Sequence, residues 1–409
     1  MTSSTSPAGV SGVLRDNSPD PERVTYLELF FDLVFVFAIT QISAVLTVEP
    51  TFLALAQGLI ICLAVWWVWV YTAWATNWLN PETRSVLRLL LALTAIGLVI
   101  SESIPSAFGH RAHLFVAAYL AYGTLRTVGV IAATRTAAPT VAAGQWRILA
   151  WSIGSGALWT AGAAQHRETW RVACWGLAIA TEYAGPAALF WLPGLGRSSW
   201  GAWRIRGGHF SERSALFVII VLGESILVIG NALDTDQLTR PVVLAAAVSF
   251  IGAALLWFLY FAHGQARGRD FLAGRISTGP VARLSYTYLH GALIVGLVAT
   301  IHGSELALHR PMELATTPDS VLVLLGPALY LGGLVAFKSS IGVRVGQIPA
   351  HLLGIASLTA LFGLSALHAV SATLLELATG AMATMLLIAI CDEILYLRRT
   401  RTEPITVGR

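Results

Sequence analysis

Residues 26–43, YLELFFDLVFVFAITQIS, decide the fold class of this chain. Together with the apolar residues that follow, they reach the length of about 20 residues that a helix needs to cross a bilayer. Glu28 and Asp32 are four residues apart, so both carboxylates lie on one face of that helix. A charged group at the membrane centre costs roughly 2.5–3.5 kcal/mol on insertion scales. Two carboxylates in one apolar helix therefore predict a polar site within the membrane, although Glu28 alone would also fit the headgroup level, where water reaches it.

The composition extends this interpretation to the whole chain. Of its 409 residues, 56% are hydrophobic and only 12% are charged, whereas soluble domains carry about 25% charged residues. We therefore predict an all-α fold, a polytopic transmembrane helix bundle in the lipid bilayer. The net charge of +4 does not indicate nucleic acid, because the Arg residues lie between the apolar runs, where the positive-inside rule accounts for them. The three cysteines lie inside apolar runs and predict packing residues.

The apolar runs predict about 12 spans. They are 26–47, 52–76, 86–106, 112–133, 147–164, 170–192, 214–232, 241–262, 284–303, 320–337, 350–368 and 372–396. Twenty of the 26 Lys and Arg residues fall in alternate loops and in the two tails, and only five fall in the remaining loops. By the positive-inside rule, both termini are cytoplasmic, and the chain is a multi-pass protein of the inner (plasma) membrane.

The domain organisation follows from the same pattern. Residues 1–22 are rich in Ser, Pro and Gly and predict a disordered cytoplasmic tail. Residues 23–399 form a single transmembrane domain, and residues 400–409 form a second cytoplasmic tail. A long loop separates six spans from six, and a Glu-Arg pair precedes both the first and the seventh span, which suggests halves 23–192 and 209–399.

Charged residues within the predicted spans are the candidates for function. Arg126 lies near the middle of the fourth span and cannot lose its charge, so it must pair or reach water. Its candidate partners are Asp32, Glu102, Glu182 and Glu224, and the sequence does not choose among them. Glu224 follows Gly223 in the seventh span, and its charge requires a proton, a cation or Arg126 to neutralise it. By contrast, Asp392 and Glu393 precede Arg398 and Arg399 and predict a solvated helix end.

Aromatic and histidine residues complete the inventory. The second span contains WWVWVYTAW at residues 66–74, which predicts either an interfacial aromatic belt or an aromatic wall that lines a cavity. His290 and His302 are separated by twelve residues in one predicted helix, about 18 Å along its axis, so they cannot bind one metal ion together. The sequence predicts no metal site and no cofactor, because it contains no HExxH, CxxC or phosphate-binding glycine motif.

Four stretches resemble a known family. They are ERVTYLELFFDLVFVFAITQIS at 22–43, TNWLNPETR at 76–84, ERSALFVIIVLGESIL at 212–227 and YLHGALIVG at 288–296. In these stretches the chain is similar to the bacterial low temperature requirement A family. The resemblance implies a multi-span helical membrane protein and implies no reaction. The recurrent polar positions of the family match Glu28, Asp32, Glu212, Arg213, Glu224 and His290.

Two functions fit these observations, and the sequence does not decide whether the chain is an enzyme. The first is a proton-linked transporter of an unidentified small solute. The second is an intramembrane enzyme that uses carboxylates as general acid or metal ligands on a lipidic or prenyl substrate, with the Trp residues facing a carbocation. A non-catalytic membrane scaffold is a third alternative. The candidates for carrying a proton or acting as an acid are Glu28, Asp32 and Glu224, and those for binding substrate are Arg126, Glu102, Glu182, Trp66, Trp69 and His290.

Overall fold

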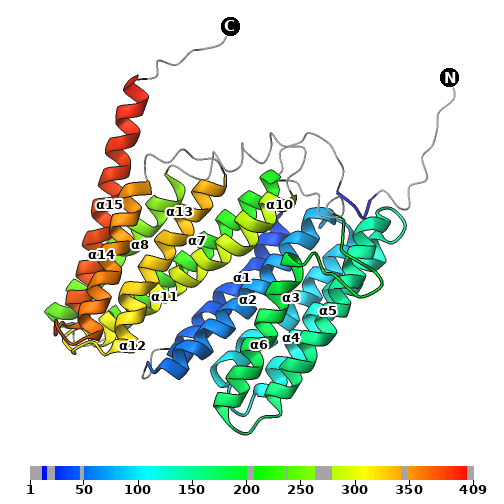
Figure 1. Ribbon diagram of the computed structural model, residues 1–409, viewed down its shortest axis with the longest axis horizontal. Coiled ribbons are helices and arrows are strands. Elements are labelled where there is room, and N and C mark those ends of the chain that lie inside the picture. The colour runs from blue at the N-terminus through cyan, green and yellow to red at the C-terminus, as the bar shows by residue number, and fades with distance from the viewer. Residues whose placement is uncertain are drawn as a thin grey trace. The chain divides into compact units, whose positions relative to one another are not determined.

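A computed structural model of the chain describes residues 12–15, 24–46, 50–199, 207–234, 238–262, 279–341 and 348–402. The long elements of this part of the chain are all helices (Figure 1), joined by turns and irregular segments in which three isolated β-bridges occur. It contains 12 long helical segments, and each corresponds to one of the predicted spans. The first six are α1 (Tyr26–Leu46), α2 (Phe52–Trp78), α3 (Arg84–Ser103) with the 3-10 turn η1 (Ile104–Ser106), α4 (Ala112–Thr134), α5 (Pro139–Ala163) and α6 (Glu168–Ala187).

The remaining segments include two with π-helical turns. They are α7 (Gly207–Leu233), α8 (Arg240–Phe261), α10 (Gly279–Ala282) continued by η3 (Arg283–Leu289) and α11 (His290–His309), α12 (Thr317–Ser320) continued by η4 (Val321–Leu325) and α13 (Gly326–Ser340), α14 (Ile348–Ala366) and α15 (Leu374–Thr402). Ten of the segments in the described part are long and apolar enough to cross a membrane. The other two are α5 and α6, whose length suffices but whose composition is less apolar.

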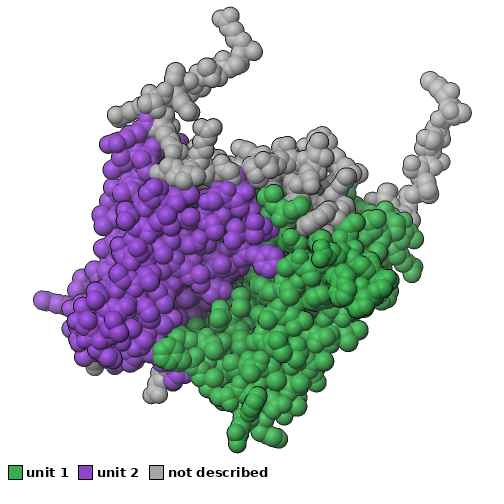
Figure 2. Space-filling view, in the orientation of Figure 1, with its two compact units in different colours: residues 1–48, 52–220, 272–283 green, residues 49–51, 221–271, 284–409 purple. Residues whose placement is uncertain are grey.

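The chain divides into two compact units (Figure 2). Residues 1–48, 52–220 and 272–283 form the first unit, and residues 49–51, 221–271 and 284–409 form the second. The division falls within α7, so the first part of this helix belongs to one unit and its second part, which carries Glu224, belongs to the other.

In the first unit, neighbouring helices along the chain pack against each other. α3 contacts α1 and α4, α5 contacts α4 and α6, and α2 contacts α1, α4 and α6. The core is strongly aromatic, because the fully buried rings of Trp66 and Trp69 stack at a centroid distance of 5.1 Å and both contact Phe217 of α7. Stacked and tilted ring pairs of this kind stabilise packing beyond the area that they bury.

In the second unit, α11 packs against η4 and α13 through glycines. A Cβ atom built on Gly303 would lie 2.9 Å from the backbone of Leu322, and one on Gly333 would lie 2.9 Å from the backbone of Leu293. A Cβ on Gly296 would collide with the Tyr330 backbone. Small residues allow the backbones of membrane helices to approach this closely. The glycines at 296 and 303 therefore fix how α11 lies against its neighbours.

The first helix begins with a capping box. The Thr25 hydroxyl accepts a hydrogen bond from the Glu28 backbone N–H at 3.3 Å, while the Glu28 carboxylate accepts one from the Thr25 backbone N–H at 3.0 Å. Near it lies a short piece of the predicted N-terminal tail, Gly12 to Arg15, which pairs with the end of α2: the Arg15 backbone N–H donates to the Trp78 carbonyl at 3.0 Å. The rest of that tail lies outside the described residues, as do residues 403–409.

Candidate functional site

Glu28 is surrounded by positively charged groups and by hydrogen-bond donors. Its side chain is fully buried. Besides the Thr25 backbone, the Thr25 hydroxyl donates to Oε2 at 3.0 Å. Oε1 lies 2.9 Å from Nη2 of Arg15, 3.1 Å from Nε2 of His209 and 3.8 Å from Nη1 of Arg213. Both carboxylate oxygens are therefore engaged, as a buried charge requires.

Asp32 pairs with Arg213 in the same cluster. Its Oδ1 atom accepts hydrogen bonds from Nη2 of Arg213 at 2.5 Å and from the indole N–H of Trp69 at 2.9 Å. Arg213 also donates to the Thr76 hydroxyl at 2.8 Å, and both Asp32 and Arg213 are fully buried. The second oxygen of Asp32, Oδ2, has no hydrogen-bond partner within the described part of the chain. We call Arg15, Glu28, Asp32, His209 and Arg213 the ion cluster.

The ion cluster is built from two matching helix faces. Glu28 and Asp32 are four residues apart on α1, and His209 and Arg213 are four residues apart on α7. Glu28 contacts His209, and Asp32, one turn later on α1, contacts Arg213, which is one turn later on α7. The two helices therefore run in the same direction where they meet, and the charges of two carboxylates and two guanidinium groups balance.

Sequence reasoning did not place the basic half of this cluster beside the two acids. The charge pattern counted Arg15 and Arg213 as tail and loop charges, although the family resemblance matched Arg213 to a recurrent polar position, and His209 was not considered. The structure instead places Arg213 in the second turn of α7, because this helix begins at Gly207, before the predicted start at residue 214. The spacing could have indicated this cluster, because the basic residues His209 and Arg213 are four residues apart, as the acids Glu28 and Asp32 are.

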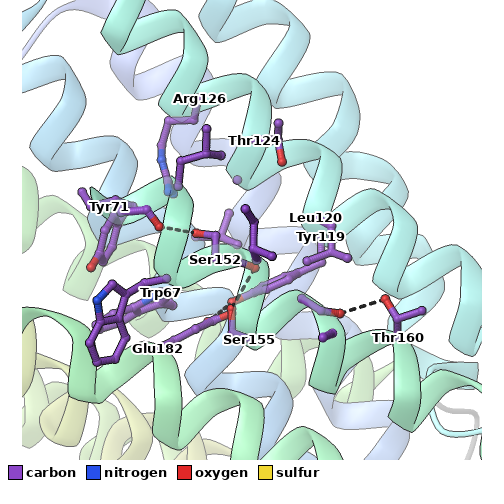
Figure 3. A pocket seen from close by; sticks show the side chains of 18 of the residues that line it. Trp67, Tyr71, Tyr119, Leu120, Thr124, Arg126, Ser152, Ser155, Thr160 and Glu182 are labelled. Atoms are coloured by element: carbon purple, nitrogen blue, oxygen red, sulfur yellow. Dashed lines mark hydrogen bonds between the residues drawn. The ribbon is translucent and has the colours of Figure 1, made fainter. Parts of the chain in front are cut away.

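A separate cavity of about 620 Å³ lies in the first unit (Figure 3), with walls from α2, α4, α5 and α6. Most of its lining is apolar or aromatic. The polar side chains on its walls are those of Trp67, Tyr71, Tyr119, Thr124, Arg126, Trp151, Ser152, Ser155, Thr160 and Glu182. A mostly apolar pocket with a few convergent polar groups is typical of small-molecule sites.

Arg126 lies in this cavity without a carboxylate partner in the first unit. Its guanidinium group lies over the ring of Tyr71, 4.8 Å from the centroid, and Nη2 is 3.5 Å from the Thr127 hydroxyl. Among the described residues of that unit, no acid lies within ion-pair distance of it: Asp32 pairs with Arg213, and the charge of Glu182 acts on Arg126 only from farther away. The sequence predicted that Arg126 pairs or reaches water, and the structure places it at a cavity with no ion-pair partner in this unit.

Glu182 lines the same cavity but is held by other groups. Its Oε2 atom accepts a hydrogen bond from the Tyr119 hydroxyl at 2.6 Å, and its Oε1 atom accepts one from the indole N–H of Trp159 at 2.9 Å. Figure 3 shows Glu182 and Tyr119 together at the cavity wall, with Arg126 farther along α4. The structure therefore brings the predicted residues Arg126 and Glu182 into one cavity while leaving the donors of Arg126 available to a ligand.

The Trp-rich run of α2 contributes side chains to the cavity and to the surroundings of the ion cluster. Trp67, which stacks on Tyr183 at a centroid distance of 4.0 Å, and Tyr71 line the cavity. The two predicted substrate-binding residues of this run, Trp66 and Trp69, are outside the cavity lining. They lie in the packed aromatic core, and Trp69 donates to Asp32. Alternate faces of one helix thus contribute to the cavity and to the ion cluster.

The remaining candidates lie elsewhere. Glu102 was grouped with the buried acids, but its side chain is 60% exposed and forms an ion pair with Arg111 at 3.0 Å. Its position at the end of α3, next to the Pro105 turn, explains the exposure. Glu224 is buried in the second-unit part of α7. Its role, like those of the other candidates, stays a prediction.

His290 is a fully buried residue of the second unit, directly after the π-helical turn η3. Its Nδ1 atom lies 2.9 Å from the Ser285 carbonyl oxygen, and its Nε2 atom lies 2.8 Å from the Tyr260 hydroxyl. Because a carbonyl can only accept, Nδ1 donates and Nε2 accepts from Tyr260. The ring also stacks on Tyr286. Both nitrogens are thus used within the protein.

Asp392 lies in a buried charged group of the second unit, which contradicts the prediction made for it. Asp392 was predicted to lie at a solvated helix end, but it is only 1% exposed. It lies 3.7 Å from Nζ of Lys338 and 3.6 Å from Nε2 of His351. These separations exceed those of ordinary hydrogen bonds. The long helix α15 explains the difference, because it continues past Asp392 to Thr402 and keeps this residue against α13 and α14.

Within the described residues, no group of three or more His, Cys, Asp or Glu side chains is arranged to hold a metal ion. The basic members of the ion cluster explain why Glu28 and Asp32 do not form such a group: their oxygens face guanidinium and imidazole groups.

The bacterial low temperature requirement A protein family (LtrA) model matches residues 23–391. The chain belongs to this family. Among curated proteins, it is similar to Uncharacterized protein RA0937 of Rhizobium meliloti (strain 1021), with 35% identity over 352 residues that cover 86% of this chain and 85% of the relative. No solved structure matches the chain. As a member of the LtrA family, it is a multi-pass membrane protein with charged residues buried among its helices.

Proposed function

We propose that this LtrA protein is a proton-linked transporter of a small solute, and that the solute binds through an anionic group to Arg126. The observation that carries the proposal is the cavity of the first unit, where this buried guanidinium group has no carboxylate of that unit within ion-pair distance. A buried charge without a partner is costly. An anionic ligand would supply the missing charge and could accept two parallel hydrogen bonds from the planar guanidinium group.

The proton would be carried by a buried acid, and the contacts rank the candidates on α1. Both oxygens of Glu28 are engaged by cations and by Thr25. Asp32 keeps one oxygen without a hydrogen-bond partner within the described residues, so it can receive a proton without losing a bond. We therefore propose Asp32 before Glu28 as the proton carrier of the first unit, and keep Glu224 as the candidate of the second.

We further propose that α5 and α6 also cross the membrane. Both helices pack along helices that are apolar enough to cross, α5 against α4 and α6 against α2. In addition, α1 and α7 run in the same direction at the ion cluster, so an even number of the first six segments must cross. Either both or neither of α5 and α6 satisfies this condition. Twelve crossings would place both termini on one side, which the positive-inside rule makes the cytoplasmic side of the inner membrane.

The first experiment is a thermal-shift screen of the purified full-length protein against a set of organic anions, followed by uptake of the stabilising anion into sealed liposomes. We expect an anion that raises the unfolding temperature of the wild type and not that of Arg126→Met, since binding to the native state stabilises it. Uptake of that anion should acidify the vesicle lumen and should be lost in Arg126→Met. If no anion stabilises the protein in an Arg126-dependent manner, the proposal is wrong.

One observation favours the alternative, an intramembrane enzyme. The cavity holds a carboxylate, Glu182, beside the aromatic rings of Trp67 and Tyr119. A carboxyl group next to aromatic faces could act as an acid on a lipidic or prenyl substrate. Formation of a product in detergent, without a sealed vesicle, and its loss in Glu182→Gln would support this alternative over transport.

A further inference from the structure

The cavity of the first unit is long and runs beside α5. Its lining extends from Ile148 to Ala164 along this helix, a separation of sixteen residues that corresponds to about 24 Å at 1.5 Å per residue. Arg126 lies eight residues before the end of α4, and Ile148 is nine residues after the start of α5. Because a short turn joins these two helices, Arg126 and Ile148 lie at similar heights. The cavity therefore continues past Arg126 for about 18 Å, to the level of Thr160.

The part of the cavity beyond Arg126 is lined mostly by small or apolar residues, among them Gly156, Ala157 and Ala161 of α5 and Ala164 just after it. Its polar members are Ser155, Thr160 and Glu182, and the Glu182 carboxylate is already held by Tyr119 and Trp159. Figure 3 shows Arg126 and Thr160 at opposite ends of the side chains that are drawn. The lining is therefore amphipathic along its length, with the free donors of a guanidinium group at one end and a mostly apolar channel leading away from it, in which the one carboxylate, that of Glu182, is already hydrogen-bonded.

The cavity opens on the side of the helices. Ile153 of α5 lines it and is 71% exposed, and Thr124, Ala157 and Ala161 line it and are also exposed. Thr124 and Ile153 lie near the middle of α4 and α5, whereas Ala161 lies near the end of α5, and α4 is one of the helices that are apolar enough to cross the membrane. An opening at this height faces acyl chains, because the hydrocarbon core is about 30 Å thick.

We infer that the cavity takes an amphiphilic organic anion, a carboxylate on a single apolar chain, that enters from the lipid between α4 and α5. The carboxylate would bind Arg126, and the chain would lie along the small residues of α5. This inference rests on the proposed function and names the class of its solute. A water-soluble anion would not need an apolar channel that opens toward lipid, whereas a chain-bearing anion partitions into the bilayer and arrives at this opening.

Two glycines provide a matched pair of variants. A Cβ atom on Gly123 or on Gly154 would meet no other atom within 4 Å, so both positions accept a side chain without a clash. Gly123 lines the cavity, near the middle of α4, and Gly154 does not line it. Leucine at position 123 would therefore enter the cavity, whereas leucine at position 154 would face outward.

The test measures quenching of tryptophan fluorescence, since Trp67 and Trp151 line the cavity. The probes are ω-bromoundecanoate, its neutral analogue ω-bromoundecanol, and the short anion bromoacetate, added to the full-length protein in lipid nanodiscs. We expect saturable quenching by ω-bromoundecanoate that is weaker with the other two probes. Replacing both tryptophans by phenylalanine should remove most of the saturable signal.

The variants test separately how the apolar chain of the ligand and its carboxylate are bound. Gly123→Leu should weaken ω-bromoundecanoate binding by at least about tenfold, because a filled channel excludes the chain, while Gly154→Leu should bind like the wild type. The wild type should bind the carboxylate at least about tenfold more tightly than the alcohol. Arg126→Met should abolish this preference and leave binding of the alcohol unchanged.

Three outcomes would overturn the inference: equal effects of Gly123→Leu and Gly154→Leu, an unchanged preference for the carboxylate in Arg126→Met, or tighter binding of bromoacetate than of ω-bromoundecanoate. The last result together with Arg126-dependent uptake of a short anion would leave the transporter proposal intact. Conversely, saturable ω-bromoundecanoate binding without any uptake into liposomes would confirm the ligand class and contradict the transporter.

Discussion

Two arginines buried in the helices of the first unit have opposite surroundings. Arg213 contacts the carboxylates of Asp32 and Glu28 and the hydroxyl of Thr76. Arg126 has an aromatic ring, one long contact to a neighbouring hydroxyl and a cavity. A buried charge that is paired with carboxylates can hold helices in register, whereas a buried charge without an ion-pair partner costs stability unless a ligand pairs with it. From this contrast we propose that the ion cluster stabilises the fold and that the cavity binds a ligand.

The largest expected effect comes from Arg213→Met. It leaves Asp32 as a buried carboxylate without its counter-charge, so we expect the free energy of unfolding to fall by about 3–5 kcal/mol. Denaturant titration of the purified protein, followed by circular dichroism, measures this loss. The double variant Asp32→Leu with Arg213→Met should recover a large part of it, because it removes both charges together. A single variant as stable as the wild type would break the comparison.

The next effect is that of Glu28→Gln. The amide keeps the shape of the side chain and can still accept from Thr25, but it loses its charged contacts to Arg15 and His209. We expect a loss of about 1–3 kcal/mol, the cost of weakened charge-assisted hydrogen bonds in a buried site. The same titration measures it, and Glu102→Gln, at an exposed ion pair, serves as the control.

Arg126→Met sharpens the comparison, because its expected effect on the free energy of unfolding differs from that of Arg213→Met. Removing a buried charge that has no carboxylate partner in its unit should not lower the free energy of unfolding, and could raise it by up to about 1 kcal/mol. The variant should nevertheless lose anion-dependent thermal stabilisation. Destabilisation as large as that of Arg213→Met would show that Arg126 is structural, and it would remove the basis of the proposed site.

The smallest effect is expected at the exposed pair of Arg111 and Glu102. Their side chains are 38% and 60% exposed, and exposed ion pairs contribute about 0–1 kcal/mol. Arg111→Ala should therefore leave the unfolding midpoint nearly unchanged in a thermal melt. A larger loss would mean that its hydrogen bond to the Glu102 carbonyl oxygen, rather than the ion pair, stabilises the end of α3.

The sequence was sufficient to locate the helices, but it was insufficient to predict which charged side chains meet between them. Apolar runs of membrane length located each long segment, because the bilayer imposes that length on every crossing. Arg213 was misread because its distance from the apolar run resembles that of a loop charge, and its carboxylate partner is 181 residues away. Asp392 was misread for the same reason, since a charge near the end of a run can either meet water or meet another helix.

The cavity shows the same limit. Arg126 and Glu182 were predicted as a site from their position in apolar helices, but the separation of Trp66 and Trp69 from Trp67 was not predictable. All three are apolar aromatic residues of one helix, and only the rotation of α2 against α4 and α6 decides which rings line a cavity. That rotation depends on packing between segments far apart in the chain.

The contacts of Glu28 have a consequence for membrane insertion. Arg15 precedes Glu28 by thirteen residues, whereas His209 follows it by 181. During synthesis, we therefore expect the first helix to enter the bilayer with Arg15 as its near counter-ion, because the basic residues of α7 are made only after five further segments. An N-terminal truncation that removes residues 1–15 would leave the nascent first helix without this early counter-charge, and should reduce the yield of inserted protein more than the stability of the finished fold.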